Sequence, residues 1–299
     1  MKIVKHLRLP RAPHWAGRAQ SWLLSLGLPL FLAVAPTMEI SPDSHRQTTA
    51  LAYEPCYMEN DTFQAGETIT YKIYYNWNFV WLSAGEVTFR VYDEGDEYHL
   101  AVRGSTYSSY EWFFTVRDNY DTYISKENLL PRLSIRDIHE GNYTRYERVT
   151  FDQGNRRAES IRGRTRTEVD TQRINLSGCM HDLLSIVYYL RNVEFDNLQA
   201  GHTIPITFYL DREQYPIKVS YLGQESSTRV KGMGRYRTHK FSPELIAGEV
   251  FKEGDEMTVW VSDDRNRIPV LIESPVSVGS VKVVLKSYNG LKYDFTAKQ

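Results

Sequence analysis

The sequence predicts a mainly β protein: a strongly curved antiparallel sheet, closed as a barrel or open as a half-barrel, with about a dozen strands and one short helix. Three observations predict it. Tyrosine accounts for 21 of the 299 residues, and its ring and hydroxyl suit pleated, half-buried surfaces. Many segments of the chain alternate apolar and polar residues with the period of two that is typical of one-sided strands. Only one segment has clear helical spacing.

The first 35 residues differ in character from the rest. Five Lys or Arg residues and no acidic residue occur in this segment. All five precede the uncharged apolar run "WLLSLGLPLFLAVA", which begins at Trp22 and ends at Ala35. This order is typical of a signal peptide, and a membrane anchor needs a longer run of about 20 residues. Ala33 to Ala35 and Ala50 to Ala52 are possible cleavage sites. We expect a signal peptide over 1–35, a flexible polar leader over 36–55 and a single β-rich domain over 56–299.

The strands begin after the leader. Ile69, Tyr71 and Ile73 alternate with polar residues, and the turn around Gly95 joins the next two apolar runs into a hairpin. Further strands are expected at 113–117, 119–125, 131–138, 143–152 and 157–167.

One helix is expected over 180–192. Leu183, Ile186, Val187 and Leu190 are spaced at i, i+3, i+4 and i+7, and Arg191 lies near the end, where a positive charge complements the helix dipole. After it, strands are expected at 203–210, 215–222, 226–232, 235–241, 257–263, 269–273 and 280–288.

Short sequence patterns recur in the two strand-rich regions. "AGETI" begins at Ala65 and "AGHTI" at Ala200, while the Asn-x-x-Pro patterns begin at Asn128 and Asn266. The near-equal spacings predict two similar halves, roughly 65–151 and 200–288, joined through the helix. The alternative is that strands and turns draw on a small set of residues, without any duplication.

Two cysteines, Cys56 and Cys179, are present. In an oxidising compartment two such cysteines pair, so a disulfide is expected; two buried free thiols are the alternative. Acylation of Cys56, as in a lipoprotein, is disfavoured because no small residue precedes it.

The sequence carries no recognisable catalytic or metal-binding motif. The histidines are scattered, and neither a nucleophile elbow nor a phosphate-binding loop occurs. Asp263 and Asp264 are typical of a turn. No metal and no cofactor are expected, and catalysis has no positive support, although distant residues can converge on a site. Without residues 1–35 the chain has 31 Lys plus Arg against 37 Asp plus Glu, a formal charge of −6 that argues against nucleic acid.

Two groups of residues are candidates for ligand binding. An aromatic segment is expected to line a concave pocket, although core packing explains the same rings; it comprises Tyr75, Trp77, Phe79 and Trp81. Three alternating arginines are expected on one strand face, where they can bind phosphate or an anionic lipid headgroup; these are Arg162, Arg164 and Arg166. The alternative for the arginines is a charged edge strand that prevents aggregation.

Three stretches of the chain resemble the bacterial domain of unknown function 3108 family: "CYMENDTFQAGETITYKIYYNWNFVWLSAGEVTFRV", "YEWFFTVRDNYDTYIS" and "MTVWVSDDRNRIPVLIESPVSVGSVKVVLKSYNGL". The resemblance implies an exported protein of the periplasm or outer envelope of a diderm bacterium, without an assigned activity. More loosely, "VWVSDDRNRIPV" is similar to periplasmic lipoprotein carriers, half-barrels that hold an acyl chain under a helical lid. This chain has one clear helix where they have several.

These observations favour a non-catalytic envelope protein that binds a hydrophobic or amphiphilic, lipid-like ligand on a concave sheet. The alternative is a structural or interaction module with a filled barrel that docks an envelope protein or a glycan. An esterase-like or glycan-cleaving enzyme is the third possibility.

Overall fold

The computed structural model describes residues 56–77, 80–112, 114–195, 197–246, 254–276 and 279–299. The expected signal peptide and leader lie outside these residues. The described chain forms one antiparallel sheet of fourteen strands and a single α-helix. The strands are β1 (Thr68–Trp77), β2 (Val80–Glu94), β3 (Glu97–Thr106), β4 (Arg117–Ser125), β5 (Pro131–Glu140), β6 (Tyr143–Asp152), β7 (Arg157–Gly163), β8 (Val169–Asn175), β9 (Thr203–Leu210), β10 (Glu213–Val230), β11 (Gly234–Pro243), β12 (Thr258–Ser262), β13 (Pro269–Pro275) and β14 (Ser280–Asn289). The predicted fold class, a curved antiparallel sheet with one short helix, is confirmed.

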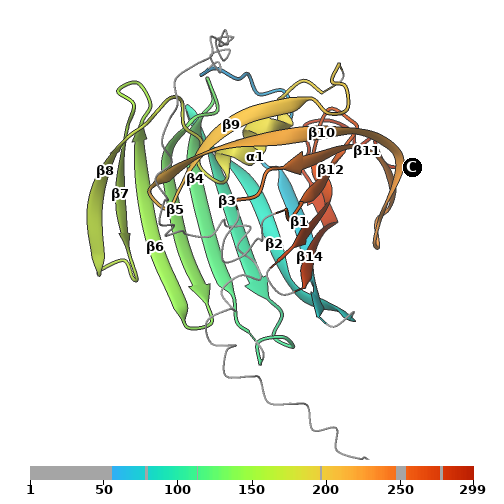
Figure 1. Ribbon diagram of the computed structural model, residues 1–299, viewed down its shortest axis with the longest axis horizontal. Helices are drawn as coiled ribbons and strands as arrows, with labels where there is room; N and C mark the ends of the chain where they lie inside the picture. Colours follow the sequence, from blue (N-terminus) through green and yellow to red (C-terminus); the bar gives the residue numbers. More distant parts are fainter. Residues whose placement is uncertain (1–55, 78–79, 113, 196, 247–253, 277–278) are drawn as a thin grey trace, which may run out of the picture.

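The strand order is β8-β7-β6-β5-β4-β3-β2-β1-β14-β13-β12-β11-β10-β9. Every neighbouring pair is consecutive in sequence except β1 and β14, which join the two regions of the sheet. The sheet curves around the helix, and β9 and β10 arch over it (Figure 1). Strands β8 and β9 are the two ends of the hydrogen-bonded order, so the sheet is not closed by a backbone ladder.

Side chains connect the two ends instead. Arg212, in the turn between β9 and β10, donates hydrogen bonds to the carboxylate and backbone carbonyl of Asp170 on β8. Gln214 donates to the backbone carbonyl of Asn175 at 2.9 Å. These contacts hold the open sheet in its curved shape.

The repeated sequence patterns fall at equivalent places in β1–β6 and β9–β14. Gly66 and Gly201 each precede the first strand of their half with a φ of 92°. Leu129 and Arg267 each precede the fifth strand, with φ values of 59° and 48° in the left-handed region that non-glycine residues rarely adopt. The matched positions therefore share unusual turn conformations, which supports the predicted duplication; the duplication itself stays a prediction.

The helix α1 (Ser185–Arg191) packs apolar residues on two sides. Leu184 and Tyr188 join the main core, which is built largely from β1–β5 and β13–β14. Ile186 and Leu190 join a second cluster with residues of β9–β12. The helix is therefore a shared wall between two parts of the interior.

Three expectations about strands were wrong in detail. The chain from 157 to 167 is β7 followed by a bend, because it reverses at Gly163, where a Cβ atom would meet the backbone oxygen of Glu168. β8, which follows, was not expected. The segments 215–222 and 226–232 are one strand, β10, whose bulges interrupt the alternation. Of residues 114–117, only Arg117 belongs to β4, and Val116 forms an isolated bridge with Glu140.

Candidate functional site

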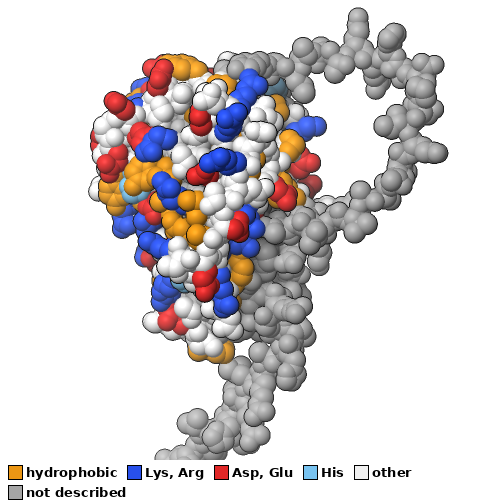
Figure 2. All heavy atoms as spheres, turned by 90° about the vertical axis from the view of Figure 1, so that its left-hand side faces the viewer, with side chains coloured by type: hydrophobic (Ala, Val, Ile, Leu, Met, Phe, Trp, Pro, Cys, Tyr) orange, Lys and Arg blue, Asp and Glu red, His pale blue; other side chains and the backbone are white. Residues whose placement is uncertain are grey.

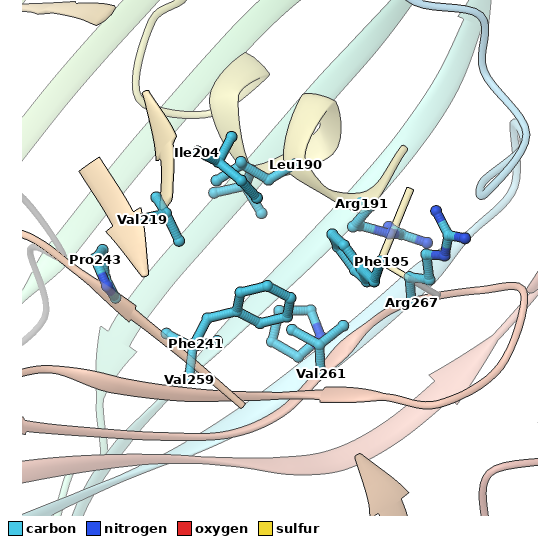
Figure 3. A pocket seen from close by; sticks show the side chains of 12 residues that line it. Leu190, Arg191, Phe195, Ile204, Val219, Phe241, Pro243, Val259, Val261 and Arg267 are labelled. Carbon is cyan, nitrogen blue, oxygen red and sulfur yellow. The ribbon is translucent and has the colours of Figure 1, made fainter. Parts of the chain in front are cut away.

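An apolar cavity lies between α1 and the sheet formed by β9–β13. Ten of its twelve lining residues are apolar, and its volume is about 80 Å³. A water molecule needs about 10–15 Å³ on this measure, so the cavity has room for several. Figure 3 shows side chains of the helix and of the surrounding strands pointing into one space. The lining residues are Val187, Leu190, Arg191, Phe195, Ile204, Val219, Phe241, Pro243, Val259, Val261, Arg267 and Pro269.

The strands supply these side chains because of their alternation. On β10 and β11, Val219 and Phe241 are buried while their sequence neighbours are more exposed. Phe195, which follows α1, packs against Phe241 with ring centres 4.7 Å apart. The result is an apolar wall opposite the helix, of the kind that binds apolar ligand surface.

A buried ion pair fixes the helix above the cavity. The Arg191 and Glu67 side chains are 4% and 1% exposed, and their charged atoms lie 2.6 Å apart. Arg191 also donates to the backbone carbonyls of Thr62 and Asn266. Both charges are therefore compensated in the interior, and the end of α1 is tied to the start of β1 and to the turn before β13.

Arg267 is the second charged residue of the cavity. Its guanidinium lies 4.9 Å from the ring centre of Phe195 and donates to the backbone carbonyl of Val193 at 2.6 Å. Its carboxylate neighbour, Glu194, is 81% exposed and 3.5 Å away. Because Glu194 is exposed and the contact is long, this ion pair is weak. In Figure 3 Arg267 and Arg191 lie at the same end of the cavity, beside Phe195. This end can accept an anionic group.

The concave side of β4–β7 differs from this cavity. Seven buried polar or charged residues come from these strands: Asp118, Thr122, Ser134, Arg136, Glu140, Glu147 and Ser160. Asp182, which precedes α1, accepts hydrogen bonds from the Thr122 and Ser134 hydroxyls at 2.5 and 2.7 Å. The concave side of this half of the sheet is therefore polar and charged.

Asp211 is the centre of a charge network on these strands. Its carboxylate lies 2.5 Å from Arg136, 2.8 Å from Arg145 and 3.8 Å from Arg162. Burial alone would raise the pKa of Asp211, but the charges of Arg136 and Arg145 outweigh burial and lower it. Asp211 is therefore held ionised, and it joins the β9–β10 turn to β5, β6 and β7.

Asp118 and Glu140 form a second acidic group on the same surface. Burial raises the pKa of Asp118 to about 6, opposed by hydrogen bonds from the His139 backbone N–H and from Glu140. The hydroxyl of the neighbouring Tyr120 is buried and has no hydrogen-bond partner among the described residues. Within the part of the chain that the structure describes, no three His, Cys, Asp or Glu residues are placed to hold a metal ion.

The structure does not bring the predicted aromatic residues together. Tyr75 is buried in a cluster with Ala84, Tyr110, Phe114 and Val116. Trp81 is the cross-strand partner of Asn76, which follows Tyr75 on β1 and points to the opposite face. Trp81 therefore lies on the face opposite Tyr75, where it is 38% exposed. The Trp77 side chain and Phe79 lie outside the described residues. Neither Tyr75 nor Trp81 lines the cavity.

The three predicted arginines also separate. Arg162 on β7 faces the charge network around Asp211. Arg164 follows the end of β7 and is exposed. Arg166 is 70% exposed, pairs with Asp137 at 2.8 Å and lies over the Tyr146 ring. The row on one face that alternation predicted does not form, because the strand ends at Gly163. On the side where β7 and β8 lie, acidic and basic side chains are intermingled (Figure 2).

Cys56 and Cys179 form the expected disulfide, with their Cα atoms 5.5 Å apart. The bond joins the beginning of the described chain to the segment that leads into α1. It closes a loop across 123 residues of sequence.

The comparison with known families assigns the chain. The profile of the family described as a protein of unknown function, DUF3108, matches residues 70–286. The chain belongs to the DUF3108 family. No curated protein matches this DUF3108 chain by sequence. Among solved structures, it is similar to the beta-barrel-like protein of domain of unknown function DUF1849 from Brucella abortus, with a TM-score of 0.50 and 9% identity over 76% of this chain and 98% of that one. This likeness concerns the fold alone.

The residues that line the cavity were not predicted as binding residues from the sequence. In the sequence, Phe241, Val261 and Val219 are ordinary apolar positions of predicted strands. Leu190 was expected on the apolar face of the helix, but the sequence did not indicate which strands pack against that face. A single weak signal was present: the predicted helix was apolar over more than one face, which indicates contacts on two sides.

Proposed function

We propose that this DUF3108 protein binds one apolar chain of an amphiphile in the cavity between α1 and β9–β13, as an exported, non-catalytic protein of the cell envelope. The apolar lining of the cavity carries the proposal. At about 80 Å³ the cavity holds a short segment of an acyl or isoprenoid chain, and the rest of the ligand extends out of it.

The charged end of the cavity favours an amphiphile over a plain hydrocarbon. Arg191 is neutralised by Glu67. Among the described residues, Arg267 has only the exposed Glu194 as an ion-pair partner, so a carboxylate or phosphate group on the ligand can compete for it. The basic and apolar N-terminal sequence and the disulfide support export.

The first test is a cavity-filling substitution. Ile204→Trp places a larger side chain at a half-buried position that lines the cavity. The matched control is Ile217→Trp, because Ile217 is also half-buried and packs on the same cluster without lining the cavity. We expect Ile204→Trp to abolish displacement-detected binding of a fluorescent fatty acid, and Ile217→Trp to retain it.

The headgroup is tested separately. Arg267→Gln is expected to weaken binding of a fatty-acid probe while leaving binding of its methyl ester unchanged, because only the acid carries a charge. Native mass spectrometry of protein from an exporting host should show a co-purifying acyl species. A ligand-free protein that binds neither probe would refute the proposal and favour an interaction module with a filled interior.

A further inference from the structure

Four lysines and three aromatic rings form a continuous patch over β1, β2 and β14, on the face of β1 opposite the buried Tyr71. We call it the lysine-aromatic patch; it comprises Lys72, Lys231, Lys282 and Lys286 with Tyr74, Trp81 and Tyr107. The Lys231 ammonium lies 4.6 Å from the Tyr74 ring centre, and that of Lys282 lies 4.8 Å from the Trp81 ring centre. Lys72 lies near both Tyr74 and Tyr107, at 5.6 and 5.8 Å.

The sheet register keeps these residues side by side. Tyr74 is the cross-strand partner of Lys282 on β14, and Lys72 is the partner of Glu86 on β2. β1 lies between β2 and β14 (Figure 1). Five of the seven patch residues therefore lie on three adjacent strands of the sheet, while Lys231 lies in the turn after β10 and Tyr107 follows the end of β3.

Exposed apolar side chains border the patch at the end of the β1–β2 hairpin. Val80 is 57% exposed and Trp81 is 38% exposed. Trp112, in the turn that follows β3, is 76% exposed. This turn begins beside β2, where the Tyr107 backbone N–H donates to the Ala84 carbonyl. Two tryptophans and a valine are thus presented to solvent at one end of the sheet.

The patch has more positive than negative charge. Glu86 pairs with Lys286, and Glu273 pairs with Lys282 at 2.6 Å. Lys72 and Lys231 have no ion-pair partner among the described residues within 4 Å. Four ammonium groups therefore face two carboxylates, on a chain whose formal charge without residues 1–35 is −6. A locally basic surface on an acidic protein attracts anionic partners to one place.

We propose that this end of the sheet docks on the surface of an anionic lipid bilayer. Tryptophan is the residue most typical of the membrane–water interface, where the ring is apolar and the indole N–H stays hydrated. Lysines near such a surface interact with lipid phosphates. Docking is a property of this outer patch, separate from the cavity and not dependent on the proposed ligand.

A bilayer fits the patch better than a protein partner does. The centre of a protein interface is depleted of lysine and is shaped to receive a partner. Here ammonium groups surround one exposed and two half-buried rings, with exposed apolar side chains beside them. That arrangement suits a surface that is charged, fluid and without fixed shape.

The test is co-sedimentation with vesicles. Protein recovered from the periplasm of an exporting host is mixed with phosphatidylglycerol-containing vesicles or with vesicles of phosphatidylcholine alone. We expect binding to the anionic vesicles that weakens with added salt. Lys72→Gln/Lys231→Gln should weaken it about thirtyfold, given the typical contribution of each lysine near an anionic surface. Trp112→Ser should weaken binding to both compositions.

Matched controls keep the result interpretable. Leu222→Ser alters a side chain that is 44% exposed on β10, away from the patch, and should bind vesicles like the unsubstituted protein. All variants have the same N-terminal sequence, so any part of the expected signal peptide that is retained contributes equally to vesicle binding in each of them. Ile204→Trp should still bind vesicles, and the double lysine variant should still bind the soluble fatty-acid probe. Vesicle binding that is equal for both compositions, or that none of the patch substitutions changes, overturns the proposal.

Discussion

The ion pair between Arg191 and Glu67 provides the sharpest test of how the helix is held. Glu67→Gln removes the carboxylate but keeps the size of the side chain. The Arg191 charge then stays in the interior, 4% exposed, without a carboxylate partner among the described residues; backbone carbonyls and the Phe63 and Tyr188 rings remain beside it. Removing one member of a buried pair typically costs about 3–5 kcal/mol. We expect a loss of that size in the free energy of unfolding.

An exposed pair of the same kind is the control. Arg132 is 56% exposed and also makes a two-bond contact to a carboxylate, that of Glu97. Glu97→Gln is expected to cost about 0–1 kcal/mol, because the freed guanidinium is hydrated. Both variants are measured by equilibrium urea unfolding, followed by tryptophan fluorescence.

A double-mutant cycle separates the interaction energy of the ion pair from the effect of each substitution on packing. Glu67→Gln combined with Arg191→Met removes both charges of this pair, so the double variant should lose less stability than the two single losses added together. If Glu67→Gln costs no more than Glu97→Gln, or if the single losses are additive, the ion pair does not anchor the helix as argued.

The remaining predictions concern pH and the disulfide. Burial lowers the pKa of His181 to about 4, below its ordinary value of 6.5, so its contribution to stability is present above pH 6.5 and is lost as the pH falls toward 4. His181→Gln should flatten the stability profile in that window, and an unchanged slope would contradict the assignment. Asp118 has the opposite sign: its pKa is raised from 3.8 to about 6, so protonation stabilises the fold as the pH falls from about 6 to 4, and Asp118→Asn should remove that gain without lowering stability at pH 7.5. Replacing Cys56 and Cys179 by serine should lower the free energy of unfolding by about 5 kcal/mol in the chain-entropy account, measured against the oxidised protein; a change below about 1 kcal/mol would refute it.

Much of the fold follows from local sequence. The alternation of Ile69, Tyr71 and Ile73 predicts β1, and the spacing of Ile186 and Leu190 predicts α1, because period-two and period-3.6 patterns are properties of neighbouring residues. The disulfide was predictable because only two cysteines exist. The bulges in β10 and the reversal at Gly163 were not, since they depend on which strand lies alongside.

The candidate site was much less predictable. The aromatic segment is dense in the sequence, but its side chains point to opposite faces of the sheet. Tyr75 points into the core, whereas Trp81 is the cross-strand partner of Asn76, the next residue on β1, and so lies on the other face. The arginines alternate in sequence, yet the strand ends before the second of them. Cavity residues such as Val219 and Val261 carry no local signal, because an apolar strand residue looks the same whether it faces a filled or an unfilled space.

The amino-acid sequence by itself determined the strand-rich class, the approximate place of the helix and the family, and it favoured the pairing of the two cysteines. Only the tertiary structure decided that one half of the concave side is charged and the other apolar, and that α1 forms the wall of a cavity. The physical reason is that periodicity fixes which side chains share a face, whereas the curvature of the sheet and the order of its strands fix what those faces meet.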